Sequence, residues 1–91
     1  MDNKSYHIIV KGKVQGVFFR ASTKEKAIEL SIQGWVKNTK DGCVEIAAIG
    51  NSINLKVFLD WCNIGPQFAK VSEINYHEIE AEELDNFEIK Y

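Results

Sequence analysis

One stretch of the chain, Gly12-Lys13-Val14-Gln15-Gly16-Val17-Phe18-Phe19-Arg20, combines residue types that recognise small anions. It ends in the only arginine of the protein, whose ten other basic residues are all lysines. A guanidinium is planar, always charged and able to make two parallel hydrogen bonds to an oxyanion, which a lysine cannot do. We therefore expect Arg20 to bind an anion.

The backbone of this stretch is a second source of hydrogen-bond donors. It joins a strand-like run to a helix-like run, and a glycine-bearing turn at such a junction can direct N–H groups at an anion. Gly16 permits a turn that most residues avoid and leaves room for an oxyanion. The amides predicted to bind the anion are those of Gln15, Gly16, Val17, Phe18, Phe19 and Arg20.

The loop also has an ordinary structural interpretation, as a tight strand-to-helix turn whose Arg20 pairs with a surface carboxylate. It matches no common phosphate motif, since GxGxxG needs a third glycine and GxxxxGK[ST] needs a lysine and a hydroxyl. Phe18 stands two positions before the arginine, so no cysteine is there to act as a phosphatase nucleophile. The loop pattern alone leaves both interpretations open.

Asn38 is a second candidate for chemistry, because asparagine is disfavoured in strands and yet ends a strand-like run here. Its side-chain amide can orient a water molecule. The alternative is hairpin chemistry, since asparagine also favours turns. Thr39 is expected to support either Asn38 or the turn.

Apolar periodicity divides the chain into alternating strands and helices. Strands are expected at 6–11, 35–38, 43–49, 71–79 and 87–91, and helices at 21–33 and from about 52 to 63. Two βαβ units that share one sheet give a ferredoxin-like βαββαβ sandwich, an α/β (α+β) fold. In this fold the sheet is antiparallel and both helices lie on one face.

Glycine and turn residues predict where these elements end. Gly34 is the expected stop of the first helix, and Gly50-Asn51-Ser52 is expected to break a strand and cap the second helix. Asp41-Gly42 is a hairpin signal. The alternation of the fourth strand slips between Val71 and Ile74, which predicts a bulge.

The second helix has two apolar sides. We expect its core stripe to consist of Leu55, Phe58, Leu59 and Cys62. The opposite side also carries apolar residues, for which cover by a neighbouring segment is favoured over an oligomer contact: Ile53, Val57, Trp61 and Ile64. The charged residues from 80 to 86 are expected to form a turn before the last strand.

Length and composition set broad limits on the protein. The chain has 91 residues, of which 45% are hydrophobic and 26% charged, as expected for a single globular domain spanning 1–91. It has no apolar run of about 20 residues and no signal-peptide pattern, so a cytoplasmic location without membrane contact is expected. Cys43 and Cys62 show no metal-ligand spacing, and we expect no metal and no disulfide.

Charge is unevenly placed along the chain. Residues 1–40 hold eight basic and three acidic side chains, whereas residues 41–91 hold three basic and ten acidic ones. A net charge of −2 argues against nucleic acid as a partner, since its affinity depends on phosphate neutralisation. The lysines at 11, 13, 37 and 40 still suit a small anion.

Three segments together resemble the signatures of the acylphosphatase family. Gly12-x-Val14-Gln15-Gly16-Val17-x-Phe19-Arg20 is similar to the first, and Gly34-Trp35-Val36-Lys37-Asn38-x-x-x-Gly42-x-Val44, with Gly50 six residues later, to the second. Gly65-Pro66-x-x-Ala69-x-Val71 resembles a third, weaker pattern, with Gln67 where proline is frequent. The resemblance extends from Tyr6 to Tyr91, and its first two signatures are specific.

The resemblance implies an enzyme of the small, common acylphosphatase type. It would hydrolyse small acyl phosphates to a carboxylate and inorganic phosphate, without metal or other cofactor, as a monomer. By the same resemblance, Arg20 and the loop amides bind the phosphoryl group, and Asn38 positions the attacking water.

Two other functions compete with this one. A ferredoxin-like domain can also be a noncatalytic anion- or RNA-binding module, although the acidic balance and the lack of an RNA-binding aromatic motif disfavour RNA. A carbamoyl-phosphate-processing unit, as in larger proteins that carry an acylphosphatase-like domain, is the third possibility.

Overall fold

The fold is described by a computed structural model, which covers residues 3–80 and 84–91. Its elements are β1 (Asn3–Lys13), α1 (Phe19–Glu29), β2 (Gln33–Asn38), β3 (Val44–Asn51), α2 (Ser52–Cys62), β4 (Lys70–Ile79) and β5 (Phe87–Ile89). Their order and types agree with the sequence-based prediction. The predicted turn at 80–86 includes residues 81–83, which lie outside the described part.

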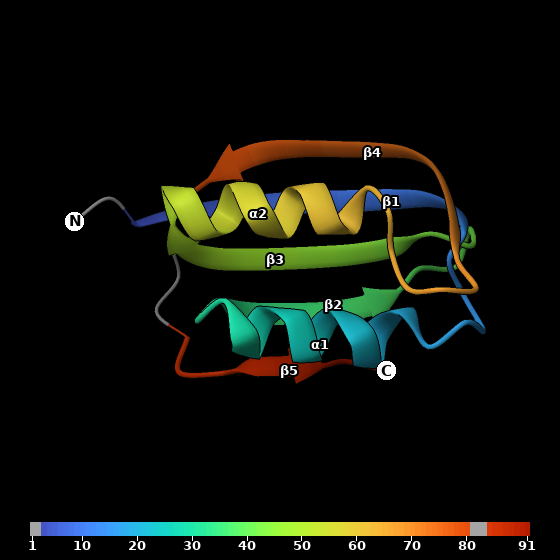
Figure 1. The fold of residues 1–91 in the computed structure, drawn as a ribbon, viewed down its shortest axis with the longest axis horizontal. Helices are drawn as coiled ribbons and strands as arrows, with labels where there is room; N and C mark the ends of the chain where they lie inside the picture. The colour runs from blue at the N-terminus through green and yellow to red at the C-terminus, as the bar shows by residue number, and fades with distance from the viewer. Residues whose placement is uncertain (1–2, 81–83) are drawn as a thin grey trace.

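The strands form one sheet in the order β4-β1-β3-β2-β5 (Figure 1). The first four pair antiparallel, as expected, whereas β5 pairs parallel with β2 at the edge and makes the sheet mixed. Figure 1 shows α1 and α2 side by side on one face of the sheet. This is the ferredoxin-like arrangement that the element order predicts.

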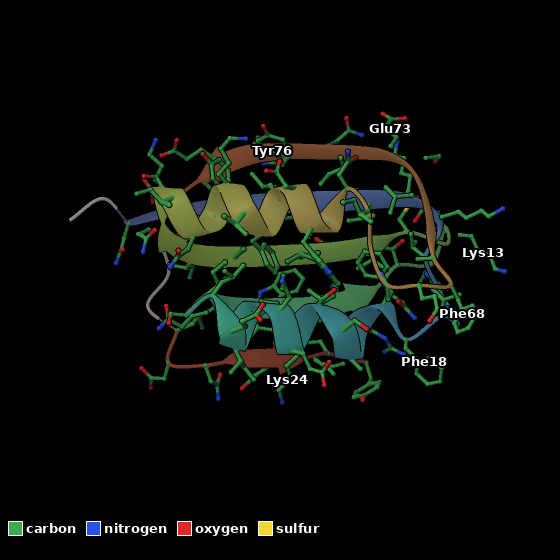
Figure 2. All side chains as sticks on the ribbon, viewed as in Figure 1. Lys13, Phe18, Lys24, Phe68, Glu73 and Tyr76 are labelled. Carbon is green, nitrogen blue, oxygen red and sulfur yellow. The ribbon has the colours of Figure 1, made fainter. Side chains whose placement is uncertain are left out.

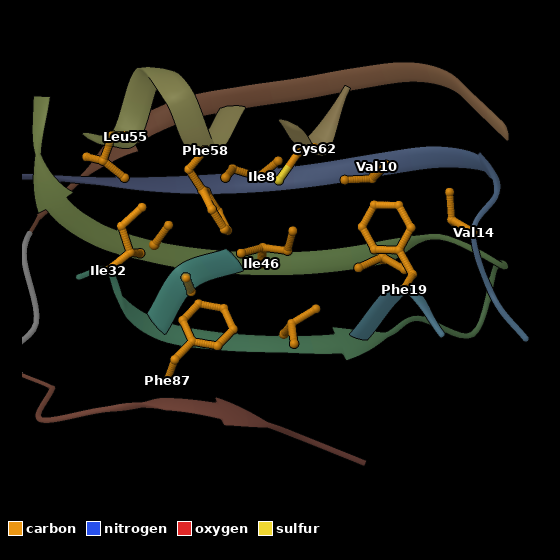
Figure 3. Close-up of a cluster of buried hydrophobic side chains, with 14 of the residues drawn as sticks. Ile8, Val10, Val14, Phe19, Ile32, Ile46, Leu55, Phe58, Cys62 and Phe87 are labelled. Carbon is orange, nitrogen blue, oxygen red and sulfur yellow. The ribbon is translucent and has the colours of Figure 1, made fainter. Parts of the chain in front are cut away.

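The core lies between this face of the sheet and the two helices (Figure 3). Side chains alternate between the two faces of a strand, so that Ile8, Val10 and Ile46 point toward the helices and are fully buried. Leu55, Phe58 and Cys62 of α2 close the core from above, as their spacing predicts.

The end of α1 differs from the prediction. The helix runs from Phe19 to Glu29, and Ser31, with φ 56°, makes the left-handed turn that was expected of Gly34. Gly34 instead lies within β2, where a Cβ atom would stand 1.8 Å from the carbonyl oxygen of Ala47. Its lack of a side chain therefore serves the close approach of β2 and β3, which the sequence does not reveal.

Two turn predictions are confirmed and one is wrong. Asn51 caps α2, since its Oδ1 accepts a hydrogen bond from the Asn54 amide at 2.8 Å. The pairing of β1 with β4 shifts register between Lys11 and Gly12, which confirms the bulge near Val71. Gly50, however, does not break the strand, because β3 continues through it to Asn51.

The second apolar side of α2 is largely uncovered. Ile53 is 77% exposed and Val57 44% exposed, and Ile64 is also exposed, so the predicted cover by a neighbouring segment is wrong for these residues. Trp61 is the exception: its ring packs against Phe19, with 5.6 Å between ring centroids.

Neither described helix has the length and hydropathy needed to cross a membrane.

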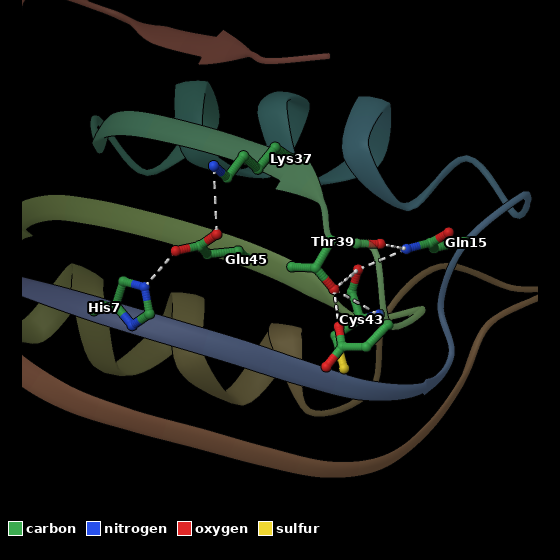
Figure 4. A network of polar contacts seen from close by, with 7 residues as sticks. His7, Gln15, Lys37, Thr39, Cys43 and Glu45 are labelled. Atoms are coloured by element: carbon green, nitrogen blue, oxygen red, sulfur yellow. Dashed lines mark hydrogen bonds and ion pairs between the residues drawn. The ribbon is translucent and has the colours of Figure 1, made fainter.

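The opposite face of the sheet carries polar groups that pair with one another (Figure 4). His7 Nε2 lies 2.7 Å from one carboxylate oxygen of Glu45, and Lys37 Nζ lies 3.6 Å from the other. His77 sits opposite His7 on β4. Both histidines therefore lie on the face of the sheet opposite the helices.

Candidate functional site

Three segments that are distant in the sequence meet at one end of the sandwich. They are the loop from β1 to α1, the last residue of β2, and the end of the chain after β5 (Figure 1). Between them lies an open cavity of about 290 Å³. The residues that line it are Val14, Gly16, Phe18, Phe19, Arg20, Ala21, Asn38, Ile89 and Tyr91.

The loop backbone borders this cavity with unbonded donors. Gly16, with φ 73°, and Phe18, with φ 63°, are both left-handed, and Phe18 stands directly before the right-handed residues of α1. Such alternation brings successive N–H groups toward one point. Within residues 3–80 and 84–91, no hydrogen-bond acceptor is found for the amides from Gln15 to Ala21. These open donors are what an anion cradle requires, and anion binding by the loop stays a prediction.

Arg20 lies in the first turn of α1 and lines the cavity. Its guanidinium carbon is 4.9 Å from the ring centroid of Tyr91. Within the described part of the chain it forms no ion pair, so the alternative of a surface carboxylate partner finds no support there. The charge stays available to a ligand.

Strand alternation brings Asn38 to the same cavity. It lies two residues after Val36, which is fully buried, and therefore on the face of β2 that the helices cover. Asn38 ends the strand and lines the cavity together with Phe19 and Arg20 at the start of α1. No side-chain hydrogen bond of Asn38 is seen within the described residues.

Gln15 has a role that the sequence did not indicate. Its side-chain Nε2 donates to the carbonyl oxygens of Thr39 and Cys43, at 2.9 Å each (Figure 4). The loop is thereby tied to the turn that follows Asn38. Gln15 and Val17 do not line the cavity, and Val17 is buried, so a phosphate contact through their amides stays a prediction.

Thr39 supports the turn rather than Asn38. Its hydroxyl accepts a hydrogen bond from the Cys43 amide at 3.0 Å and donates one to the carboxylate of Asp41. That donation lowers the pKa of the Asp41 carboxyl below its usual range. These hydrogen bonds hold the β2–β3 turn in one conformation. The turn therefore fixes the position of Asn38 and of the two carbonyl groups that Gln15 binds, a pair of contacts called the Gln15 clamp below.

Phe19 holds the loop to the core by burying its side chain. Its ring is buried beside Trp61, and a Cβ on Gly65 would stand 2.7 Å from it. Gly65 and Ala69 belong to the third segment that resembles a family pattern, and the absence of a side chain at Gly65 leaves room for the Phe19 ring. The contribution of this segment to the site is packing.

Ile89 and Tyr91 are cavity residues that sequence reasoning missed. The sequence predicts a last strand at 87–91, but nothing in it shows that β5 pairs parallel with β2. Only this pairing brings the end of the chain to Arg20.

Neither cysteine forms a disulfide within the described residues. Cys43 and Cys62 are free thiols, and burial raises the pKa of Cys62 above its usual range. Within the described residues, no group of three or more His, Cys, Asp or Glu side chains is arranged to hold a metal ion. Independence from metal stays a prediction.

The chain is thus a small ferredoxin-like α+β protein, in which a loop with open donors, Arg20 and Asn38 meet at one cavity. The acylphosphatase family model matches residues 6–89, and the chain belongs to the acylphosphatase family. It is 50% identical over 76 residues to an acylphosphatase of Marinobacter nauticus, covering 84% of this chain and 83% of that protein.

Solved structures agree with this assignment. An acylphosphatase from Coxiella burnetii superposes with a TM-score of 0.95 at 42% identity, over 98% of this chain and 94% of that one. The acylphosphatase from Bacillus subtilis gives a TM-score of 0.93 at 40% identity, over 97% and 99% of the two chains.

Proposed function

We propose that this protein hydrolyses the carboxyl-phosphate bond of small acyl phosphates, giving a carboxylate and inorganic phosphate. The observation that carries the proposal is one cavity bordered by the unbonded loop amides, Arg20 and Asn38. Membership of the acylphosphatase family supports it.

The substrate itself lowers the demand on the site. When the P–O bond breaks, the electron pair leaves with a carboxylate, whose conjugate acid has a pKa of about 4. Such a leaving group departs without protonation, so a strong general acid is not needed. The site has to hold the phosphoryl group and the water in line.

The phosphoryl group is held by charge and fixed dipoles. The transition state of phosphoryl transfer is loose, and negative charge is spread over the three equatorial oxygens. The guanidinium of Arg20 and the N–H groups of Gly16, Phe18 and Phe19 supply donors at the cavity wall. Donors fixed before the reaction stabilise that charge without reorganisation.

Asn38 is proposed to orient the attacking water through its side-chain amide. The described residues that line the cavity include no Asp, Glu or His side chain that could accept a proton from this water. The proton therefore passes to a phosphate oxygen of the substrate as the new P–O bond forms. This route needs no metal and no side-chain base.

We infer a single domain over 1–91 that acts as a monomer in the cytoplasm, with no nucleic acid or membrane partner. The basic residues near the loop and the acidic balance elsewhere favour a small anionic substrate over a polyanion.

The deciding experiment is phosphate release from benzoyl phosphate, followed with and without EDTA. We expect turnover well above the uncatalysed rate and the same rate in both conditions. No turnover would leave the noncatalytic anion-binding alternative, and loss of activity on chelation would rule out the metal-independent mechanism.

A further inference from the structure

We propose that the side chains of Phe18 and Tyr91 form a subsite for the acyl group, which favours aromatic acyl phosphates over acetyl phosphate. The inference rests on the proposed function, because it assigns the part of the substrate that the phosphoryl cradle does not hold. Both rings line the cavity that Arg20 and Asn38 also line.

One part of the cavity lining is polar and the other part is apolar or aromatic. The phosphoryl group needs the loop amides, Arg20 and Asn38. The lining also contains Phe18, Ile89 and Tyr91, whose side chains are not buried in the core as those of Val14 and Phe19 are. These three side chains are apolar or aromatic. An apolar wall beside a polar cradle suits an amphipathic ligand, with its anion in the cradle and its apolar part on the wall.

Phe18 is exposed in a way that packing does not explain. Its neighbours Val17 and Phe19 are buried, whereas Phe18 is 78% exposed and extends away from the ribbon (Figure 2). It also has a left-handed backbone, with φ 63°, which is unusual for a bulky residue. Strained conformations of this kind cluster at ligand sites.

Tyr91 is placed beside the charge that binds the phosphoryl group. Its ring lies 4.9 Å from the guanidinium carbon of Arg20, within the range of a cation–π contact. The ring is otherwise fully exposed. An acyl group that extends from a phosphoryl bound at Arg20 therefore has this ring within reach.

The size of the cavity sets the scale of the acyl group. Its volume of about 290 Å³ is at the small end of ligand pockets, which span roughly 300–1,000 Å³. A phosphoryl group with one aromatic ring is of the right size, whereas a folded protein substrate would contact only the rim. We therefore expect selectivity among small acyl phosphates.

The test compares benzoyl phosphate with acetyl phosphate. Phe18→Ala and Tyr91→Ala should each lower the benzoyl-to-acetyl ratio of kcat/KM by about three- to tenfold, the range of one aromatic pair contact. Tyr91→Phe keeps the ring and should keep the ratio. Phe68→Ala is the matched control, since Phe68 is 66% exposed but does not line the cavity.

A binding measurement separates this inference from the proposed function. Benzoylphosphonate and acetylphosphonate lack the scissile bond, and their Kd values are measured by calorimetry for the same variants. A benzoyl preference that falls in Phe18→Ala supports the subsite even if no acyl phosphate is hydrolysed. Hydrolysis of both substrates with unchanged ratios in both alanine variants would overturn the subsite and leave the proposed function standing.

Discussion

The two helices of this protein begin in opposite ways. At α2, Asn51 has an extended backbone, with φ −73° and ψ 156°, and its side chain accepts a hydrogen bond from the Asn54 amide. At α1, Phe18 is left-handed and offers no side-chain acceptor. Neither helix has an acidic residue in its first turn.

The capped N-terminus of α2 contributes to stability, whereas the uncapped N-terminus of α1 is open to a ligand. A helix leaves its first four N–H groups without helical partners, and a side-chain cap satisfies part of that need within the chain. The start of α1 keeps its donors open beside Arg20, so an anion can satisfy them. Changes at α2 should therefore alter stability, and changes at α1 should alter activity.

The largest loss of activity is expected for Arg20→Lys. Lysine keeps the charge but not the planar pair of donors, so kcat/KM for benzoyl phosphate should fall by about 10²- to 10³-fold, as for loss of a transition-state donor. Steady-state kinetics and inhibition by phosphate measure it. Lys56→Ala, which removes a largely exposed cation of α2 that does not line the cavity, is the control. Near-normal kinetics in Arg20→Lys would reduce the arginine to a surface charge.

Asn38→Ala should come next, with a loss of about 10²-fold in kcat, because the attacking water is no longer oriented. Phosphate affinity should be retained, since the cradle of α1 is unchanged. The measurement pairs kcat with the inhibition constant of phosphate. If phosphate affinity is lost together with the rate, Asn38 is a structural residue of the turn.

Gln15→Ala tests whether the open end of α1 must be tied to the β2–β3 turn. It removes two hydrogen bonds, one to the Thr39 carbonyl and one to the Cys43 carbonyl, although each carbonyl keeps a backbone donor. At about 0.5–1.5 kcal/mol for each lost bond, the unfolding free energy should fall by about 1–3 kcal/mol. The loosened loop should also lower kcat/KM by about tenfold. Denaturant unfolding and kinetics are measured together.

Gln67→Ala, an exposed glutamine of the loop before β4, is the control for Gln15→Ala. It should change neither quantity. A Gln15→Ala variant that loses stability and keeps full activity would show that the clamp does not position the loop.

Asn51→Ala is the counterpart at the capped helix. Loss of the cap should lower the unfolding free energy by about 1 kcal/mol, while kcat/KM for benzoyl phosphate stays unchanged. Denaturant unfolding gives the first value and steady-state kinetics the second. A clear loss of activity in this variant would contradict the division between the two helix ends.

The smallest effect on stability is expected for Phe18→Gly. Glycine adopts the left-handed conformation without steric cost, so the unfolding free energy should be unchanged or higher by up to about 1 kcal/mol. Denaturant unfolding checks this expectation, with Phe68→Gly as the control at an exposed phenylalanine. A marked loss of stability would mean that the exposed ring packs more firmly than its position indicates.

Local patterns predicted most of the fold. The alternation of Ile8 and Val10, the spacing of Leu55, Phe58 and Cys62, and the cap at Asn51 act over a few residues, so they can be recognised in the sequence. The end of α1 was predicted too late. Gly34 is required by the carbonyl oxygen of Ala47, a contact between strands that no local signal reports.

The candidate site also has features that the sequence determines and features that only the tertiary structure determines. By itself, the sequence determined the unusual loop, the single arginine and Asn38, and the family signatures joined them to one chemistry. Only the tertiary structure decided that Gln15 clamps the turn, that Arg20 has no described carboxylate partner, and that Tyr91 lies at the cavity. Each of these depends on segments brought together by strand pairing, and the parallel pairing of β5 with β2 is a long-range choice that local sequence does not encode.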